Sequence, residues 1–218
     1  MNLNIYGRKL NKVNNFGKLT PENRLYNIPC PIIGLTGGIA TGKSSATKIL
    51  EEMGINVICA DKLVKNVYQS SKTQDYLTKN HPDVIEKDGI NFKRLRELFF
   101  SDDTVKNAIE TLIYSQMPDA FKLAFSKFKS PDFIVYDVPL LFEKGLDKLV
   151  DLKALVYAPK DIQIQRLIRR DSIDEQLARN IISKQIDIET KRGRCDVVLQ
   201  NTGTLEDLKI EIKKGLNI

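Results

Sequence analysis

Several patterns that would assign a protein to a class are missing from this chain of 218 residues. No apolar run approaches the roughly 20 residues that a transmembrane helix requires. The N-terminal residues contain no apolar core of a secretory signal. They are basic and almost free of acidic residues, as in a transit peptide, but the first 30 residues contain no serine. These absences favour a cytoplasmic protein.

Cysteine and histidine are also scarce. The three cysteines, Cys30, Cys59 and Cys195, are odd in number and show no C-x-x-C spacing. We therefore expect free thiols in a reducing compartment. The single histidine, His81, excludes a metal site built from several histidines. His81 precedes Pro82 in a loop-like stretch, where we expect a surface or hinge position.

Most of the excess positive charge lies near the N-terminus. The chain has 34 Lys and Arg residues against 28 Asp and Glu residues, a net charge of +6. The first 30 residues hold five of these cations and a single acid, which leaves only +2 for the other 188 residues. We therefore expect a basic N-terminal arm, and the charge distribution argues against a nucleic-acid-binding domain.

From residue 32 onward, short apolar runs alternate with helical patterns. Strands are predicted at residues 32–35, 57–59, 133–136, 152–157 and 197–199, and helices at 44–53, 159–170, 174–185 and 204–214. Residues 61–128 are predicted to be mostly helical. Their longest helix is capped by Asp102 or Asp103 and is kinked or ended by Pro118. Short apolar strands between helices predict a parallel sheet covered on both faces.

A glycine-rich loop joins the first predicted strand to the first helix. Residues 37–44 (GGIATGKS) fit G-x-x-x-x-G-K-[ST] at every fixed position. Backbone N–H groups in such a loop surround phosphate, and the helix N-terminus adds partial positive charge. We expect ATP here, with Lys43 bridging the β- and γ-phosphates and the Ser44 hydroxyl ligating Mg²⁺. The alternative is an ordinary glycine-rich turn. The predicted ATP-binding residues of this loop are Gly38, Ile39, Ala40, Thr41, Gly42, Lys43, Ser44 and Ser45.

The rest of the sequence indicates which class of nucleotide-binding protein this is. A GTPase usually carries Asn-Lys-x-Asp after a later strand. The one Asn-Lys pair here, Asn11-Lys12, lies upstream of the loop and is followed by Val13-Asn14. This argues against guanine recognition. The chain is also short for a motor ATPase, and its length suits a small-molecule kinase.

Five segments together resemble the dephospho-CoA kinase family. They are TGGIATGKSS (36–45), GINVICAD (54–61), DVPLLFE (137–143), QIQRLIRRD (163–171) and DVVLQN (196–201). Their order and spacing hold across residues 32–212, and residues 1–31 lie outside the resemblance. The glycine-rich loop is common to many NTPases, whereas the segment 139–143 and the Ala-Asp pair after the second strand are more specific.

The resemblance implies an α/β fold, a three-layer P-loop NTPase with a five-stranded parallel sheet, a helical acceptor-binding insertion and a lid. An irregular basic extension, residues 1–31, would precede the kinase domain, residues 32–218. Within that domain, the expected parts are a core (32–60, 132–160 and 195–218), a helical CoA-side segment (61–131) and the lid (171–185).

The implied reaction transfers the γ-phosphate of ATP to the ribose 3′-hydroxyl of dephospho-CoA, giving coenzyme A and ADP with Mg²⁺. This is the last step of coenzyme A biosynthesis. Two alternatives remain open. One is a kinase for another nucleotide or nucleoside. The other is a non-catalytic nucleotide-binding regulator whose basic arm contacts RNA or a membrane.

Two acids follow predicted strands and are candidates for chemistry. Asp61 follows the second strand, so we expect it near the carboxyl ends of the strands, where the phosphate loop also lies. A carboxylate there can accept the proton of an attacking hydroxyl, and the resemblance implies this role. The alternative is an N-cap for a helix that begins at Lys62. Asp137 ends the third strand, and it is either an indirect contact of the metal or a solvated strand end.

Two arginines share one face of the helix at 159–170. Arg166 and Arg170 are four residues apart, and planar guanidinium groups match the oxygens of a phosphoryl group. The resemblance implies that Arg166 contacts the nucleotide phosphates. The alternative for both is a solvated stripe paired with Asp161, Asp171 or Asp174. The resemblance also assigns Pro139, Leu140 and Leu141 to the wall of the acceptor pocket.

The resemblance predicts a lid whose phosphate contacts would be Arg179 and Lys184. It also implies that Asn201 and Gly203 lie against adenine. Three positions depart from the family pattern. Ile181 stands where many members have an arginine four residues before the lid glutamine. Met117 replaces the histidine of a His-Pro pair, and Phe92 replaces an arginine that often follows an Asn or Asp.

Overall fold

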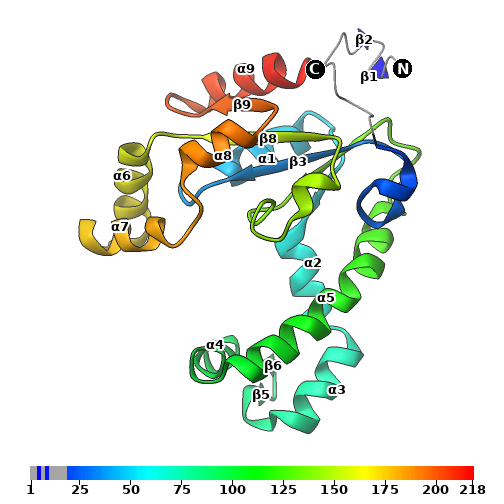
Figure 1. Ribbon diagram of the computed structural model, residues 1–218, viewed down its shortest axis with the longest axis vertical. Helices are drawn as coiled ribbons and strands as arrows, with labels where there is room; N and C mark the ends of the chain where they lie inside the picture. Colours follow the sequence, from blue (N-terminus) through cyan, green and yellow to red (C-terminus); the bar gives the residue numbers. More distant parts are fainter. Residues whose placement is uncertain (1–3, 6–7, 10–18) are drawn as a thin grey trace. The chain divides into compact units, whose positions relative to one another are not determined.

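The computed structural model describes residues 4–5, 8–9 and 19–218 (Figure 1). The chain forms two compact units. One comprises the residues up to Cys59 together with Phe128–Ile218, and the other comprises Ala60–Lys127. In the described part of the chain, no helix is both long enough and apolar enough to cross a membrane.

The first unit is built on a five-stranded sheet with the strand order β4-β7-β3-β8-β9. Every neighbouring pair in this sheet is parallel. The strands are β3 (Ile32–Gly37), β4 (Val57–Cys59), β7 (Ile134–Asp137), β8 (Leu152–Tyr157) and β9 (Val197–Gln200). The predicted three-layer α/β fold with a five-stranded parallel sheet is therefore confirmed. All five strands match predicted ones, with boundaries shifted by at most two residues.

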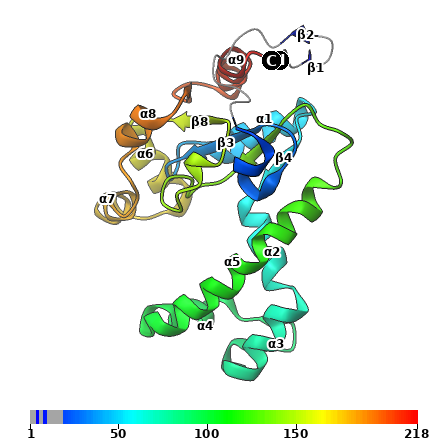
Figure 2. The same cartoon turned by 45° about the vertical axis from the view of Figure 1, so that its right-hand side comes forward.

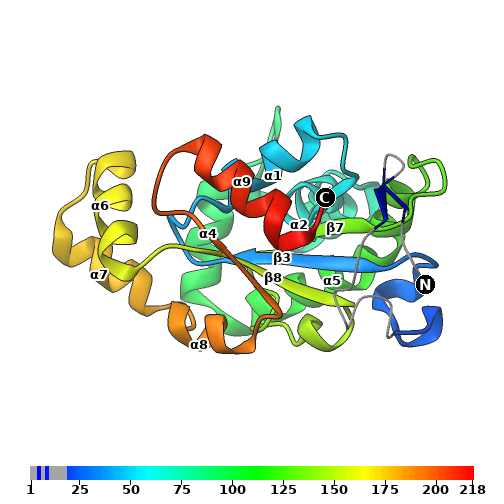
Figure 3. The ribbon, with the colours of Figure 1, turned by 90° about the horizontal axis from the view of Figure 1, so that it is seen from above.

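Helices cover both faces of this sheet, and alternate strand residues point to each of them. On one face, α1 (Lys43–Glu52) and α9 (Leu205–Leu216) pack against one side of β3, β7, β8 and β9. Leu155 and Tyr157 of β8 point the other way and pack against Ile188 of α8 (Ile188–Arg194). Figure 3 shows α1 and α9 on one side of β3 and β8, and α8 on the other. The glycine-rich loop leads from β3 of this sheet into α1, which covers one of its faces.

A helical pair follows β8. It consists of α6 (Lys160–Asp171) and α7 (Glu175–Ser183). Ile164 and Leu167 of α6 pack with Ala178 of α7, and Ile39 and Ala40 of the glycine-rich loop lie against this cluster. The pair therefore contacts the loop through apolar side chains.

The second unit is helical (Figure 2). It contains α2 (Ala60–Tyr68), α3 (Ser71–Asn80), α4 (Phe92–Ser101), α5 (Asp103–Phe125) and the short strands β5 (Ile85–Glu86) and β6 (Gly89–Ile90). As predicted, Asp102 caps the long helix, since its side chain accepts hydrogen bonds from two backbone N–H groups. The helix does not end at Pro118, because buried Ile113, Met117 and Phe121 anchor it on both sides of the proline.

Within the first unit, the segment that precedes β3 is held by hydrogen bonds to residues that follow β7. Residues 21–23 and 25–27 form two 3-10 turns, and Leu25 donates its N–H to the Leu149 carbonyl at 2.9 Å. Arg24 Nε donates to Asp151 Oδ2 at 2.6 Å, with side chains 3% and 0% exposed. The predicted extension over residues 1–31 falls partly outside the described residues. Its first described strands, β1 (Asn4–Ile5) and β2 (Arg8–Lys9), pair in antiparallel fashion.

Candidate active site

The glycine-rich loop lies at the carboxyl end of β3 and leads directly into α1. Ala40 and Gly42 have positive φ angles of 58° and 89°, which let the backbone curl. The buried Thr41 hydroxyl donates to the Gly38 carbonyl at 2.9 Å and closes the turn. The predicted residues from Gly38 to Ser45 all lie in this loop or in the first turn of α1.

Asn201 and Arg166 support the backbone of the glycine-rich loop through hydrogen bonds. The Asn201 side chain donates to the Thr41 carbonyl at 2.7 Å. Arg166 Nη2 donates to the Asn201 carbonyl at 2.9 Å, and its Nη1 lies 3.5 Å from the Thr41 carbonyl. A Cβ atom at Gly42 would lie 2.0 Å from the Asn201 amide nitrogen, so no other residue fits there without displacing Asn201. The structure therefore brings Arg166 and Asn201 to the loop.

Lys43 and Asp137 form an ion pair at the carboxyl end of the sheet. Asp137 is 3% exposed, and its second oxygen accepts a hydrogen bond from the Thr47 hydroxyl at 2.8 Å. The Thr47 hydroxyl lies one helical turn beyond Lys43, whose carbonyl is 3.0 Å away. The interpretation of Asp137 as a solvated strand end is therefore wrong, because the carboxylate is buried and has two side-chain partners.

The segment after α7 reaches the loop through one polar contact. Gln185 Oε1 accepts a hydrogen bond from the Ile39 N–H at 2.8 Å. Ile181, at the position where many family members carry arginine, packs with Ile182 against the cluster beside the loop. The predicted lid arginine, Arg179, is paired with Glu175 on its own helix at 2.6 Å. Ile181 therefore contributes an apolar contact beside the loop.

Arg170 does not reach the loop in this structure. Its guanidinium binds both oxygens of Asp171, at 2.7 and 2.9 Å, and both side chains are more than a third exposed. The bond from Arg170 lowers the pKa of the Asp171 carboxyl. Asp171 is one of the acids named above as an alternative partner of this arginine.

The segment that follows β7 is fixed at its first residues. The Thr36 hydroxyl donates to the Pro139 carbonyl at 3.1 Å. Leu141 is fully buried, and a Cβ atom at Gly34 would lie 3.1 Å from its Cδ1. Leu140 is 41% exposed. Of these residues, Leu140 is the side chain most available to a ligand.

Lys191 of α8 was not predicted from the sequence as a site residue. Its side chain is 1% exposed, and its Nζ lies 2.8 Å from Glu143 Oε1. The same Nζ lies 3.4 Å from the Gly37 carbonyl and 3.5 Å from the Pro139 carbonyl. A signal existed in the sequence, because Asp187 is a good N-cap, but the helix is too short and too charged to show an apolar face.

Asp61 belongs to the helical unit. It lies in the first turn of α2, is exposed, and follows Cys59, the last residue of β4, by two residues. Cys59 is paired with Asp137 in the sheet. The alternative role as an N-cap of a helix beginning at Lys62 is wrong, because the helix already begins at Ala60. An acid in the first turn also interacts favourably with the helix dipole.

The two positions of this unit that depart from the family pattern have structural partners. The Phe92 ring packs edge-on against Tyr68, with centroids 5.3 Å apart. Met117 is 5% exposed on the inner face of α5. Both side chains therefore contribute to packing within the unit.

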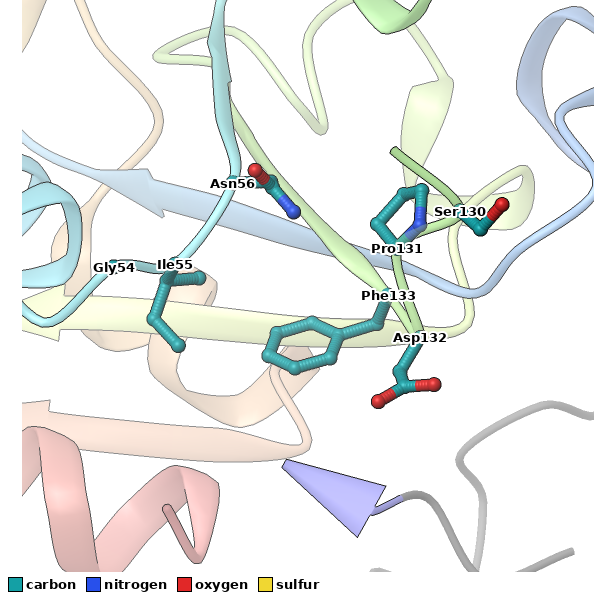
Figure 4. A pocket seen from close by; sticks show the side chains of 7 residues that line it. All are labelled: Gly54, Ile55, Asn56, Ser130, Pro131, Asp132 and Phe133. Atoms are coloured by element: carbon teal, nitrogen blue, oxygen red, sulfur yellow. The ribbon is translucent and has the colours of Figure 1, made fainter. Parts of the chain in front are cut away.

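Two pockets adjoin the sheet in the first unit. One, of about 240 Å³, lies beside the phosphate loop and is lined by Gly38, Lys160, Gln163 and residues 182–183 and 185–188. The other, of about 210 Å³, lies where β4 and β7 begin and is lined by residues 54–56 and 130–133 (Figure 4). Its polar side chains are Asn56, Ser130 and Asp132, without lysine or arginine. This composition does not favour a phosphate ligand.

With this geometry established, comparison with known proteins identifies the family. The family model described as dephospho-CoA kinase matches residues 31–207, which is most of the chain. This chain belongs to the dephospho-CoA kinase family. The resemblance noted from the five segments is therefore confirmed, as is the expectation of a P-loop kinase. A kinase family also implies ATP as the phosphate donor, in agreement with the loop.

Individual relatives and solved structures are similar to this chain over most of its length. A dephospho-CoA kinase of Fusobacterium nucleatum is 36% identical over 185 residues, which cover 84% of this chain and 95% of the relative. A dephospho-CoA kinase of Pseudoalteromonas translucida is 34% identical and covers 88% and 94%. Among solved structures, dephospho-CoA kinase from Campylobacter jejuni has a TM-score of 0.61 at 25% identity, covering 85% and 95%. TT1252 from Thermus thermophilus has a TM-score of 0.76 at 28% identity, covering 86% and 97%.

Proposed function

We propose that this chain transfers the γ-phosphate of ATP to the ribose 3′-hydroxyl of dephospho-CoA, giving coenzyme A and ADP. The observation that carries this proposal is the complete phosphate loop at the carboxyl end of β3, in a chain of this family. Phosphoryl transfer needs positioning and charge stabilisation more than covalent chemistry. The residues of this chain would supply both.

The glycine-rich loop, Arg166 and Asn201 would bind the phosphate donor, ATP. Backbone N–H groups from Gly38 to Ser45 would surround the phosphates, and Lys43 would bridge the β- and γ-phosphates. Arg166 already lies at the loop, and its guanidinium would oppose charge on the transferred group. Asn201 holds the loop backbone and would border the adenine. Arg170 would contact the phosphates only after its ion pair with Asp171 breaks.

The donor atoms present would suit Mg²⁺. The Ser44 hydroxyl in the first turn of α1 is a hard oxygen ligand, and the Asp137 carboxylate at the end of β7 is bonded to the neighbouring Lys43. A bound Mg²⁺ would neutralise charge on the β- and γ-phosphates. Ser44 would hold it directly, and buried Asp137 would orient its surroundings while keeping Lys43 in place.

On the acceptor side, Asp61 would act as the base. Its carboxylate is exposed in the first turn of α2, two residues beyond the strand that pairs with β7. It would orient the 3′-hydroxyl and accept its proton as the phosphoryl group transfers. The segment Pro139–Leu141 would form part of the acceptor wall, with Leu140 as its exposed side chain. Residues 171–185 would serve as a lid that excludes water. The predicted cytoplasmic location and domain boundaries remain predictions.

A coupled ADP-release assay with dephospho-CoA tests this function. Wild type should release ADP only when both ATP and dephospho-CoA are present. Asp61→Asn should lose about 100-fold or more in kcat, the usual range for removing a general base. Asp75→Asn, an exposed acid on α3 of the same unit, is the matched control and should keep wild-type activity.

The outcomes separate the alternatives. A wild-type protein that is inactive with dephospho-CoA but phosphorylates nucleosides or other nucleotides would establish a different kinase. An Asp61→Asn variant that keeps most of the activity would remove Asp61 from the mechanism while leaving the reaction in place.

A further inference from the structure

Helix α8 places a lysine in the interior. Lys191 is buried, with 1% of its side chain exposed, although lysine is almost never fully buried without a partner. Removing an ammonium group from water is costly unless its donors are satisfied. The partners of Lys191 therefore indicate what this side chain does.

The three partners of the Lys191 ammonium belong to two segments of the candidate site. Glu143 Oε1 is 2.8 Å away, and the carbonyls of Gly37 and Pro139 are 3.4 and 3.5 Å away. An ammonium group has three donors, so this set uses all of them. Gly37 begins the phosphate loop, whereas Pro139 begins the segment proposed to face the acceptor and Glu143 lies two residues beyond the end of that segment.

Other contacts hold the same segment. The guanidinium of Arg194, also on α8, lies 4.2 Å from the centre of the Phe142 ring and 3.2 Å from Asp147 Oδ2. The Pro139 carbonyl also accepts the Thr36 hydroxyl of β3. Leu140 points outward between these fixed points and is 41% exposed.

The phosphate loop does not depend on Lys191 for its shape. Its curl is held by the Thr41 hydroxyl, the Asn201 amide and Arg166. Loss of Lys191 should therefore release the segment after β7 more than the loop itself.

We propose that Lys191 is a positioning residue that ties the segment Pro139–Glu143 to the phosphate loop and so sets where the acceptor lies relative to ATP. The inference rests on the proposed function for its acceptor. A reacting hydroxyl must lie within a fraction of an ångström of its productive position, so release of this segment would be costly for catalysis. The resulting effect should fall on the acceptor and not on the nucleotide.

Steady-state kinetics on Lys191→Met test this role. We expect the KM for dephospho-CoA to rise, and kcat/KM to fall with it, by roughly ten- to hundred-fold. The Kd for ATP, measured without acceptor, should stay within about twofold, because the loop keeps its own supports. Lys48→Met is the matched control, since Lys48 pairs with Glu52 on an exposed surface with side chains 77% and 64% exposed. The control should change neither constant.

A double variant separates positioning from stability. Lys191→Met leaves Glu143 without its partner, and Lys191→Met with Glu143→Leu removes that unpaired charge. The double variant should regain most of the thermal stability but keep the raised KM for dephospho-CoA. If the double variant regained both its thermal stability and the wild-type KM for dephospho-CoA, the proposal would be overturned. A loss of ATP affinity as large as the rise in this KM would also overturn it. If Lys191→Met alone does not fold, the KM of the double variant for dephospho-CoA tests the proposal.

A measurement without acceptor distinguishes this proposal from the proposed function. Amide hydrogen exchange in the 138–147 segment should be faster in the double variant than in wild type, whatever the enzyme phosphorylates. Unchanged exchange would overturn the positioning role even if dephospho-CoA is the acceptor. An inactive wild type with the expected exchange pattern would instead overturn the acceptor assignment.

Discussion

The buried pair of Arg24 and Asp151 predicts a large stability effect from a residue outside the family match. The two side chains are 3% and 0% exposed and share two hydrogen bonds of 2.6 and 3.0 Å. Arg24 also donates to the carbonyls of Ile28 and Leu19. Arg24→Met would leave a buried carboxylate and two carbonyls without this partner. Breaking such a pair costs about 3–5 kcal/mol.

Urea unfolding followed by circular dichroism measures this loss of free energy of unfolding, and a thermal melt measures the shift in midpoint. At roughly 2–4 °C per kcal/mol for a chain of this size, the thermal midpoint should fall by about 6–20 °C. The control is Arg179→Met, whose pair with Glu175 is 48% and 60% exposed and should be worth less than about 1 kcal/mol. Equal losses in Arg24→Met and Arg179→Met would refute the reasoning, because burial would then not determine the cost.

Two further predictions concern the glycines and the thiols. Gly42→Ala should lower ATP affinity by more than about tenfold, because its Cβ would lie 2.0 Å from the Asn201 amide nitrogen. Gly145→Ala has a similar positive φ with nothing within 4 Å and should bind ATP normally, so a matching loss in both would contradict the clash. Burial raises the pKa of Cys30 to about 11 and of Cys195 to about 12. Iodoacetamide at pH 8 should therefore label both at least about 100-fold more slowly in the folded than in the urea-unfolded protein, and equal rates would disprove the raised pKa values. Since the unfolded thiols ionise first, their contribution to stability is present below about pH 9 and is lost as the pH rises above it.

Local patterns were sufficient to predict the sheet and the loop. Apolar runs such as Leu152–Tyr157 are long enough to form buried strands, and the first helix ends where Gly54 takes a φ of +78°. The loop motif has fixed residues at fixed spacing, so one sequence suffices to locate it. These features depend on neighbours along the chain.

Other features depend on contacts between distant residues. Helix α8 was missed because one of its two buried side chains is Lys191, and a lysine does not register as part of an apolar face. The strands β5 and β6 were missed for a different reason, because each has only two residues and shows no alternating pattern, although Asp88-Gly89 is a hairpin signal and Gly89 has a φ of +114°. The pairing of Lys43 with Asp137 could not be read from the sequence, because it depends on β7 lying beside β3.

The ion pair between Lys43 and Asp137 also affects the entropy of nucleotide binding. A free lysine side chain carries about 2 kcal/mol of rotamer entropy, most of which is lost when it is fixed on a ligand. Here Asp137 restricts Lys43 before any ligand arrives, with Thr47 holding the carboxylate in turn. Much of that entropy is therefore lost when the chain folds. Binding of a nucleotide then requires an exchange of oxygen partners around an ammonium group whose motion is already restricted.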